Sequence, residues 1–409
     1  MAEQHEKALV PQIRFTGFTD PWEQRKLGEL TESYSGGTPA AGESEFYGGS
    51  IPFIRSAEIA AESTELFLTE KGYESSSARM VKPGDVLYAL YGATSGEVAV
   101  SRQKGAINQA ILAILPRDDC DARYITAWLR KQKGYIVTTY LQGGQGNLSG
   151  VIVKNLEVFI PSLPEQQKIG FMLSHLDSLI TLHQRKYDKL CVLKKSMLDK
   201  MFPKGGSLYP EIRFAGFTDP WEQRKLGEVA RRVTRKNENG DSDLPLTISA
   251  QYGLVDQRTF FNSQVASKDM SGYFLLHRGE FAYNKSTSTD SPWGAIKRLE
   301  KYDMGCVSTL YICFELLSGD PDFLVTYYET DRWYKSVQLI AAEGARNHGL
   351  LNIAPDDFFE TQICIPKRID EQRRIGAFFD RLDSLITLHQ RKLELLRNIK
   401  KSMLDKMFV

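Results

Sequence analysis

Residues 163–202 are LPEQQKIGFMLSHLDSLITLHQRKYDKLCVLKKSMLDKMF, and residues 369–408 repeat the stretch as IDEQRRIGAFFDRLDSLITLHQRKLELLRNIKKSMLDKMF. The two copies are identical at 25 of 40 positions, including the unbroken runs LDSLITLHQRK and KKSMLDKMF. Apolar side chains recur in both copies with the spacing of a helical stripe. We therefore expect each copy to form one long helix.

The stripe repeats every seven residues, which is typical of a coiled coil. A helix of this length spans roughly 60 Å at about 1.5 Å per residue, so its stripe needs a partner of similar length. The other copy is such a partner, and we infer that the two helices pack against each other. The sequence leaves their direction open, but an antiparallel pair would put one globular domain at each end. The seam contains Ile169, Leu176, His183, Leu190 and Met197 in the first copy and Ile375, Leu382, His389, Leu396 and Met403 in the second.

A second repeat defines the organisation of the chain. Residues 11–29 (PQIRFTGFTDPWEQRKLGE) return as residues 210–228 (PEIRFAGFTDPWEQRKLGE), with 17 of 19 positions identical. This order indicates a tandem duplication of motif, variable domain and helix. We interpret the motif as a structural plug against the helices, in which Asp20 can cap and Pro21 can open a short helix.

The two repeats divide the chain into six predicted segments. These are an N-terminal frame motif (1–30), a first globular domain (31–162), a first long helix (163–202), a linker with the repeated motif (203–229), a second globular domain (230–368) and a second long helix (369–409).

Both globular domains are predicted to be small α+β domains, because short apolar runs bounded by glycine and proline accompany stretches of helical spacing. In the first domain we expect strands at 51–56 (IPFIRS), 85–90 (DVLYAL), 107–114 (INQAILAI) and 151–160 (VIVKNLEVFI), and a helix at 124–140. In the second we expect strands at 280–284 (EFAYN) and 306–314 (CVSTLYICF), and a helix at 323–339.

The composition is that of an ordinary globular protein, with 42% hydrophobic and 25% charged residues. The chain has no run of eighteen apolar residues and no hydrophobic signal core at its start, so we expect a cytoplasmic protein without a membrane partner. The five cysteines show no CxxC spacing, which argues against a disulfide framework and a zinc site. The net charge of +1 means that any attraction for phosphates must come from local clusters or from partner chains.

The sequence contains no motif of a known catalytic site. It lacks GxxxxGK, HExxH, GxSxG and the Pro-Pro-aromatic tetrapeptides of amino-methyltransferases. The glycine-rich GGQGNLSG (143–150) precedes a predicted strand, which is the wrong context for a dinucleotide site. His183 and His389 have no further ligands at suitable spacing, so we interpret them as packing positions and expect no metal. We expect a non-catalytic chain. The alternatives are a self-contained DNA-acting enzyme such as a nuclease, and a purely structural scaffold.

Polar and aromatic side chains gather in loops at matching places of the two globular domains. Asn and Gln suit adenine, Arg and Lys suit guanine, and hydroxyl groups suit phosphates or bases. Such loops can also be merely solvated, so the recurrence matters more than any single residue. The candidate DNA contacts of the first domain are Arg55, Ser56, Tyr88, Tyr91, Thr94, Ser95, Asn108, Gln109, Gln142, Gln145 and Asn147. Those of the second are Gln251, Tyr283, Asn284, Lys285, Ser286, Thr287, Ser288, Arg346, Asn347 and His348.

With these features in view, nearly the whole chain resembles the specificity subunit of type I restriction-modification enzymes. The resemblance rests on the doubled DPWEQRKLGE motif, the doubled EQ..IG…LDSLITLHQRK…KKSMLDKMF helix and the phrases GGTP, IPFIRS and YGATSGEVAV. It implies an α+β fold with two target recognition domains, separated by a pair of long antiparallel coiled-coil helices and related by an internal pseudo-twofold repeat. Each domain would recognise half of a split DNA sequence.

The resemblance also implies partners and cofactors. It implies two modification subunits that bind S-adenosylmethionine and methylate adenine, and up to two restriction subunits that use ATP and Mg²⁺ to translocate and cut double-stranded DNA. This chain itself would bind no cofactor. A DNA-mimicking anti-restriction protein is a further candidate partner. Arg185, Lys186, Arg391 and Lys392 on the basic helix faces are candidates for docking partner helices or contacting phosphates, and a merely solvated face is the alternative.

Overall fold

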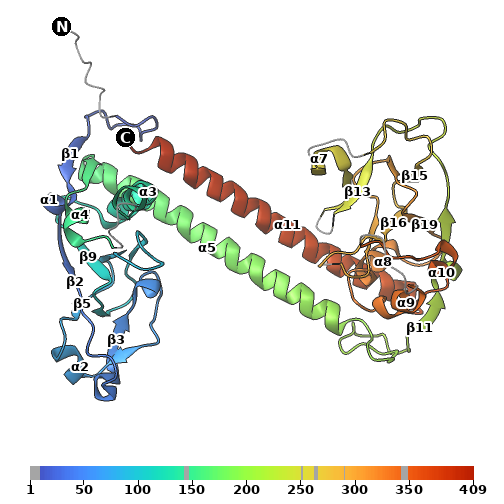
Figure 1. Cartoon of the computed structure of the whole chain (residues 1–409), viewed down its shortest axis with the longest axis horizontal. Coiled ribbons are helices and arrows are strands. Elements are labelled where there is room, and N and C mark those ends of the chain that lie inside the picture. The colour runs from blue at the N-terminus through green and yellow to red at the C-terminus, as the bar shows by residue number, and fades with distance from the viewer. Residues whose placement is uncertain (1–9, 142–146, 250–251, 262–265, 290, 342–348) are drawn as a thin grey trace, which may run out of the picture. The chain divides into compact units, whose positions relative to one another are not determined.

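The computed structural model describes residues 10–141, 147–249, 252–261, 266–289, 291–341 and 349–409. The chain forms two compact units (Figure 1). The first unit contains residues 1–185 and 390–409, and the second unit contains residues 186–389. Within the described residues, none of the helices combines the length and the apolar character that crossing a membrane requires.

The first unit contains an α+β domain. Its elements are β1 (Glu23–Lys26), α1 (Leu27–Leu30), β2 (Thr31–Ser35), η1 (Ser44–Phe46), β3 (Tyr47–Ile54), η2 (Ser56–Glu58), β4 (Phe67–Leu68), α2 (Glu70–Glu74), β5 (Arg79–Val81), β6 (Val86–Ala89), β7 (Val98–Val100), β8 (Gly105–Ile107), β9 (Ile111–Pro116), α3 (Ala122–Leu141), α4 (Gly150–Lys154) and β10 (Glu157–Ile160).

One four-stranded sheet, of order β2-β9-β6-β7, forms the middle layer of the first unit. Successive side chains of a strand point to opposite faces, so β6 contributes to two cores. Val86 and Tyr88 pack on α3 and the start of the first long helix, whereas Leu87 and Ala89 pack in a separate cluster with residues of the β4-β3-β8-β5 sheet. The strand is therefore covered on both faces.

The second unit repeats this plan. Its elements are β11 (Glu222–Lys225), α6 (Leu226–Val229), β12 (Ala230–Val233), β13 (Leu246–Ser249), β14 (Gly253–Asp256), α7 (Gln257–Phe261), β15 (Phe274–His277), β16 (Phe281–Asn284), β17 (Ala295–Arg298), β18 (Met304–Val307), β19 (Ile312–Leu316), α8 (Pro321–Tyr327), α9 (Tyr334–Ile340), α10 (Pro355–Phe359) and β20 (Gln362–Ile365). The sheet β12-β19-β16-β17 has the strand order of β2-β9-β6-β7, and the ribbon β11-β20 corresponds to β1-β10.

Both predicted long helices are confirmed as α5 (Leu163–Lys200) and α11 (Ile369–Lys406). Their pairing is visible within the first unit, which holds the beginning of α5 and the end of α11. Lys400 forms an ion pair with Asp177, and Arg397 Nη2 donates to Gln184 Oε1 over 2.9 Å. Because the later residue of α5 faces the earlier residue of α11, the two helices are antiparallel there.

The second unit contains the complementary halves of the two helices and shows the same direction. Lys194 Nζ lies 2.6 Å from Asp383 Oδ1, and the ring centroids of Phe202 and Phe379 are 6.1 Å apart. None of the ten residues of the predicted seam is exposed. The fold class expected from the sequence, two α+β domains with a pair of antiparallel long helices, is therefore confirmed.

The repeated frame motif packs against the end of a long helix in each unit. Trp22 is buried beside Tyr124 and Phe408, and its ring centroid lies 6.4 Å from that of Phe408. Trp221 is buried in the same way, 5.8 Å from Phe202. The motif thus has the structural role that we expected. It does not open a short helix at Asp20 and Pro21, because the chain bends at Asp20 and then enters β1, which pairs with β10.

The repeated Glu-Gln pair at the start of each long helix ties the helix to its unit. The side chain of Glu165 is fully buried and accepts two hydrogen bonds from Arg14, at 2.7 and 2.8 Å. Gln166 Oε1 accepts from the Asp121 backbone N over 2.9 Å, at the start of α3. A buried carboxylate is stable only when it is paired, so the clamp needs both partners. The equivalent contacts of the second unit are Arg213 with Glu371 and Gln372 with Asp320.

Several predicted elements are interrupted in the structure. The expected strand 107–114 is divided by a turn in which Asn108 Oδ1 accepts from the Ala110 backbone N. Residues 306–314 and 323–339 are divided likewise, into β18 and β19 and into α8 and α9. The expected strand 151–160 begins as α4, because Ser149 caps it by accepting from the Ile152 N over 3.3 Å. Only residues 157–160 of that stretch form a strand, β10.

Candidate nucleic-acid interface

The structure brings together two of the polar segments that the sequence singled out in the first unit. The chain leaving β6 pairs with the chain entering α4, since the Leu148 N donates to the Leu90 O over 2.9 Å. The next residues, Tyr91 and Asn147, form an isolated antiparallel bridge. Asn147 is exposed, and the side chains of Thr94 and Ser95 are half-buried in the same loop as Tyr91.

The same pairing recurs at the equivalent place of the second unit. The Leu351 N donates to the Lys285 O over 3.0 Å, and Ser286 bridges to Leu350. Thr287 then closes the pairing, because its N and Oγ1 both donate to the Gly349 O, at 2.7 and 2.9 Å. Each unit thus has one composite loop, built from the segment after β6 or β16 and the segment before α4 or α10. We call these the first and second composite loops.

Asn108 and Gln109 lie in the turn beside the first composite loop. Gln109 is exposed and accepts a hydrogen bond from Thr38 Oγ1. Burial raises the pKa of Tyr91, while its hydrogen bond with Gln109 opposes the shift. Thr38 is brought there by GGTP: a Cβ on Gly36 would lie 1.8 Å from the Ile107 O, so only glycine permits this approach. The sequence analysis missed Thr38, although GGTP was the signal that could have found it.

The structure corrects the predicted roles of Tyr88 and Tyr283. Both side chains are fully buried within their strands, so neither can contact DNA while the core is intact. Burial raises the pKa of Tyr88 to about 12 and the pKa of Tyr283 further. Tyr283 donates its hydroxyl hydrogen to the Trp293 O over 2.7 Å and stacks on Phe358. Both tyrosines are core residues beneath the composite loops.

Three further candidates are engaged in local contacts. Arg55 Nη2 lies 2.6 Å from Glu58 Oε1 and 3.7 Å from Glu65 Oε2, so two carboxylates already neutralise it. The Arg55 guanidinium holds the pKa of Glu58 down at about 2. Asn284 Oδ1 accepts from the Ser286 N over 3.0 Å, and Lys285 Nζ donates to the Ile353 O over 3.3 Å. Partial burial lowers the pKa of Lys285. Asn284 and Lys285 therefore shape the second composite loop.

The remaining candidates divide into two groups. Ser56 is half-buried at the start of η2, and Ser286 and Ser288 are exposed on the second composite loop. The predictions that lie outside the described residues are those for Gln142, Gln145, Gln251, Arg346, Asn347 and His348.

The outward faces of the long helices carry more than the predicted basic residues. Arg185, Lys186, Arg391 and Lys392 are exposed, as expected. The two helices also expose large apolar side chains that lie outside the ten residues of the predicted seam. These are Leu182, Val192 and Leu193 on α5 and Leu385, Leu388, Leu395 and Ile399 on α11.

The described residues provide no metal site of ordinary composition. Within residues 10–409, apart from the gaps given above, His, Cys, Asp and Glu side chains form no group of three that could hold an ion. His183 and His389 are half-buried in the helix seam.

Comparison with known proteins finds a family match over part of the chain and several curated relatives. Residues 19–191 match the type I restriction modification DNA specificity domain. The type I restriction enzyme MjaIX specificity subunit of Methanocaldococcus jannaschii is 27% identical over 233 residues, which cover 53% of this chain and 53% of that protein. The EcoR124I/EcoR124II specificity subunit of Escherichia coli is 26% identical over 187 residues, which cover 41% and 46%. The chain spans about half the length of these curated relatives.

The fold is shared with a solved structure. The crystal structure of a type I restriction-modification system S subunit from M. genitalium has a TM-score of 0.62 and 13% sequence identity, and the match covers 98% of this chain and 99% of that one. This chain is therefore similar to the specificity subunits of type I restriction-modification systems, by the family match over residues 19–191 and by the named relatives.

Proposed function

We propose that this chain recognises a bipartite sequence of double-stranded DNA, with each globular domain contacting one half of the target. The observation that supports this most directly is the recurrence of the composite loop. Two segments meet by the same backbone pairing in both units, yet their side chains differ: Tyr91 is bridged to Asn147 in one, and Ser286 is bridged to Leu350 in the other. A constant backbone with changed polar groups suits two domains that recognise different bases.

The antiparallel helices would set the spacer between the two half-sites. A coiled-coil pair is stiff along its axis, because each seam residue packs between residues of the facing helix.

In this proposal, catalysis belongs to other chains. Two modification subunits would bind S-adenosylmethionine and methylate adenine, up to two restriction subunits would use ATP and Mg²⁺ to translocate and cut DNA, and this chain would hold no cofactor. An exposed apolar helix face flanked by cations suits the docking of partner helices. The proposed docking residues are Leu182, Arg185 and Lys186 on α5 and Leu388, Arg391, Lys392 and Leu395 on α11. A DNA-mimicking anti-restriction protein would compete with DNA at the composite loops.

The test uses one substitution in each composite loop. Sequencing methylated adenines in a genome that carries this gene first gives the target, which we expect to be two half-sites with a fixed gap. Methylation by the reconstituted complex is then measured on DNA altered in one half-site at a time. Asn147→Ala should weaken or relax recognition of one half-site by about 1–3 kcal/mol, and Ser286→Ala should affect only the other half-site.

Glu74→Ala is the control, because Glu74 is an exposed acidic residue of the same domain and cannot attract phosphate. A uniform loss of methylation on all sequences would show that Asn147 and Ser286 contact the DNA backbone, which contradicts the proposal. The purified chain alone, with DNA and Mg²⁺, should cut nothing. Cleavage would favour the alternative of a self-contained nuclease.

A further inference from the structure

An ion pair links the two long helices at equivalent places of the two units. In the first unit Asp177 of α5 contacts Lys400 of α11, and in the second unit Lys194 of α5 contacts Asp383 of α11. The repeated helices are offset by 206 residues, so Asp383 is the counterpart of Asp177 and Lys400 is the counterpart of Lys194. The same Asp and the same Lys of the repeat therefore form both pairs. We call each pair a Lys–Asp dyad.

In the first unit the globular domain adds a positive charge to the dyad. Arg130, on α3, places its Nη1 2.6 Å from Asp177 Oδ2, and Lys400 contacts the other oxygen of this carboxylate. Arg130 Nε also donates to the Val98 O over 3.2 Å. The aspartate thus receives two cations, and its side chain is 30% exposed.

In the second unit the globular domain adds a negative charge instead. Glu329 Oε2 lies 2.7 Å from Lys194 Nζ, which also contacts Asp383 at 2.6 Å. Here the lysine receives two anions, and its side chain is 18% exposed. Lys297 of β17 adds a weaker contact to Glu329, at 3.7 Å.

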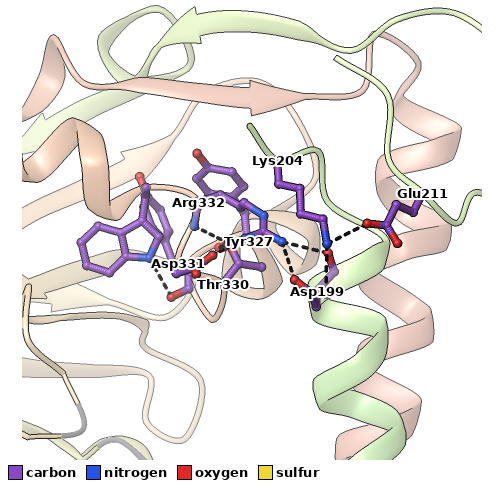
Figure 2. A network of polar contacts seen from close by, with 9 residues as sticks. Asp199, Lys204, Glu211, Tyr327, Thr330, Asp331 and Arg332 are labelled. Atoms are coloured by element: carbon purple, nitrogen blue, oxygen red, sulfur yellow. Dashed lines mark hydrogen bonds and ion pairs between the residues drawn. The ribbon is translucent and has the colours of Figure 1, made fainter. Parts of the chain in front are cut away.

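The loop that carries Glu329 is fixed by its own contacts (Figure 2). Thr330 Oγ1 donates to the Tyr327 O over 2.6 Å, which closes the turn after α8. Arg332 Nη2 donates to Asp199 Oδ1 over 3.0 Å, and Lys204 binds the same carboxylate at 3.1 Å. The turn is therefore tied to the end of α5, so Glu329 is held over the dyad.

Arg130 and Glu329 occupy the same position of the repeated fold. Helices α3 and α8 begin after equivalent caps, in which Asp121 Oδ1 accepts from the Tyr124 N and Asp320 Oδ1 accepts from the Phe323 N, both over 2.9 Å. The offset of 199 between the caps also separates 130 from 329. One position thus has opposite charges in the two units, while the dyad beneath it has the same composition.

A Lys–Asp dyad can satisfy either charge. A carboxylate has about four lone-pair sites and an ammonium group has three donors, so each can hold its helix partner and one more ion. We propose that the dyad is a docking socket that accepts a third charge of either sign from the globular domain, and that Arg130 and Glu329 are the positioning residues that fill it. The proposal goes beyond the proposed function, because it concerns the free chain and needs no DNA.

The test transplants the first-unit arrangement into the second unit of the full chain. The counterpart of Lys297 is Ala99, since Val98 and Ile296 lie opposite Tyr88 and Tyr283 in the two sheets. The variant Glu329→Arg with Lys297→Ala therefore reproduces the charges of the first unit. We expect it to keep the melting temperature of the Lys297→Ala parent within about 2 °C, because Asp383 can accept the new guanidinium.

Adding Asp383→Asn removes the acceptor and leaves the introduced guanidinium at position 329 beside Lys194 without an anion. The combined variant should then lose at least about 4 °C more in melting temperature than the sum of two losses, that of Glu329→Arg with Lys297→Ala and that of Asp383→Asn alone. Hydrogen–deuterium exchange of residues 186–200 and 321–340 localises the loss to the second unit. Arg130→Glu, with and without Lys400→Met, is the mirrored pair in the first unit.

Two outcomes would overturn the proposal. One is that Glu329→Arg with Lys297→Ala destabilises the second unit, or prevents its folding, whether or not Asp383 is present. The other is that Glu329→Ala and Arg130→Ala both leave exchange and melting temperature unchanged, because a filled socket cannot be emptied without effect. A merely structural contact of fixed sign would not tolerate the reversed charge.

Discussion

At the scale of single residues, Gly170 makes a close contact that the repeat preserves. A Cβ on Gly170 would lie 2.7 Å from Asp121 Oδ1 and 2.8 Å from the Tyr124 N, at the cap of α3. We predict that Gly170→Ala lowers the free energy of unfolding of the first unit by about 1–3 kcal/mol, because the cap must move. Urea denaturation followed by hydrogen–deuterium exchange of α3 measures the change.

Gly134→Ala is the matched control, because Gly134 lies within α3 with nothing within 4 Å of the added carbon. It should raise stability by about 0.5–1 kcal/mol through helix propensity. If both substitutions lowered stability equally, the close contact at Gly170 would not be the cause.

Glu58 makes the stability of the first unit depend on pH. Its pKa is about 2 in the folded chain, below the ordinary value of 4.5, because Arg55 donates hydrogen bonds to the carboxylate. A depressed carboxylate pKa stabilises the fold above the unfolded value, and this contribution is lost as the pH falls from about 5 towards 2. We predict that Glu58→Gln lowers the urea midpoint most at pH 7 and that its difference from the parent narrows below about pH 4.5.

Glu65→Gln serves as the control, because Glu65 is 92% exposed and lies 3.7 Å from Arg55. A surface ion pair of this kind contributes little to stability. The urea midpoint of Glu65→Gln should therefore differ little from that of the parent at every pH. If the difference in urea midpoint between Glu58→Gln and the parent did not change with pH, the lowered pKa of Glu58 would not be the source of the pH dependence.

The sequence showed that a Glu-Gln pair and a Gly recur in the long helices, but not what these residues contact. Glu165 meets Arg14, which is 151 positions away, and Gly170 meets the cap of α3. Such pairs depend on tertiary packing, which no local pattern encodes. The same reason explains Tyr88: an alternating strand shows which residues share a face, but here both faces are buried.

At the scale of elements, the residues that follow α11 complete the core of the first unit. Phe408 is 4% exposed and packs on Trp22 and Tyr124, with centroids 6.4 and 5.2 Å away. We predict that Phe408→Ala lowers the free energy of unfolding of the first unit by about 3–5 kcal/mol, because it leaves a cavity. Hydrogen–deuterium exchange of residues 22–30 and 122–141 provides the measurement.

Val409→Ala is the neighbouring control, since Val409 is 36% exposed and should tolerate the change. Phe202→Ala should act in the same way on the second unit, where Phe202 packs on Trp221 and Phe379. A loss of protection confined to α11 after Phe408→Ala would mean that the helix end does not support the core.

Long elements with a sustained period were predictable, whereas short ones were not. The heptad pattern predicted α5 and α11, each of 38 residues, nearly to their observed ends. The β-branched run after Ser149 favoured a strand, but one capping hydroxyl and the burial of Val153 start it as α4. In the second unit a turn at residues 328–333 ends α8, whereas α3 continues at the equivalent place of the first unit. The helix of one domain therefore could not predict the helices of the other.

At the scale of the whole molecule, the proposed spacer role makes a prediction about length. Inserting one heptad into each long helix, in register, adds about 10 Å, which corresponds to roughly three base pairs of DNA. We expect the reconstituted complex to lose its preference for the original spacer and to prefer a longer one. Methylation of DNA with graded spacers measures this.

An insertion into only one helix is the control, because it shifts the seam against its partner and should destabilise the chain without defining a new spacer. An unchanged preferred spacer after the double insertion would rule out the helix pair as the determinant of target spacing. The composite-loop substitutions would still report on base recognition, so the two parts of the proposal fail separately.

The division of the first unit between the two ends of the chain has a consequence for its synthesis. Residues 1–185 leave the ribosome long before residues 390–409, whereas the second unit is continuous from 186 to 389. Until Met407 and Phe408 have been synthesised, the apolar surface of Trp22 that they cover stays open. A prematurely ended chain would expose this apolar surface to proteases and chaperones. Limited proteolysis of a chain ending at residue 400 should therefore cut within residues 10–30 faster than limited proteolysis of the full chain does.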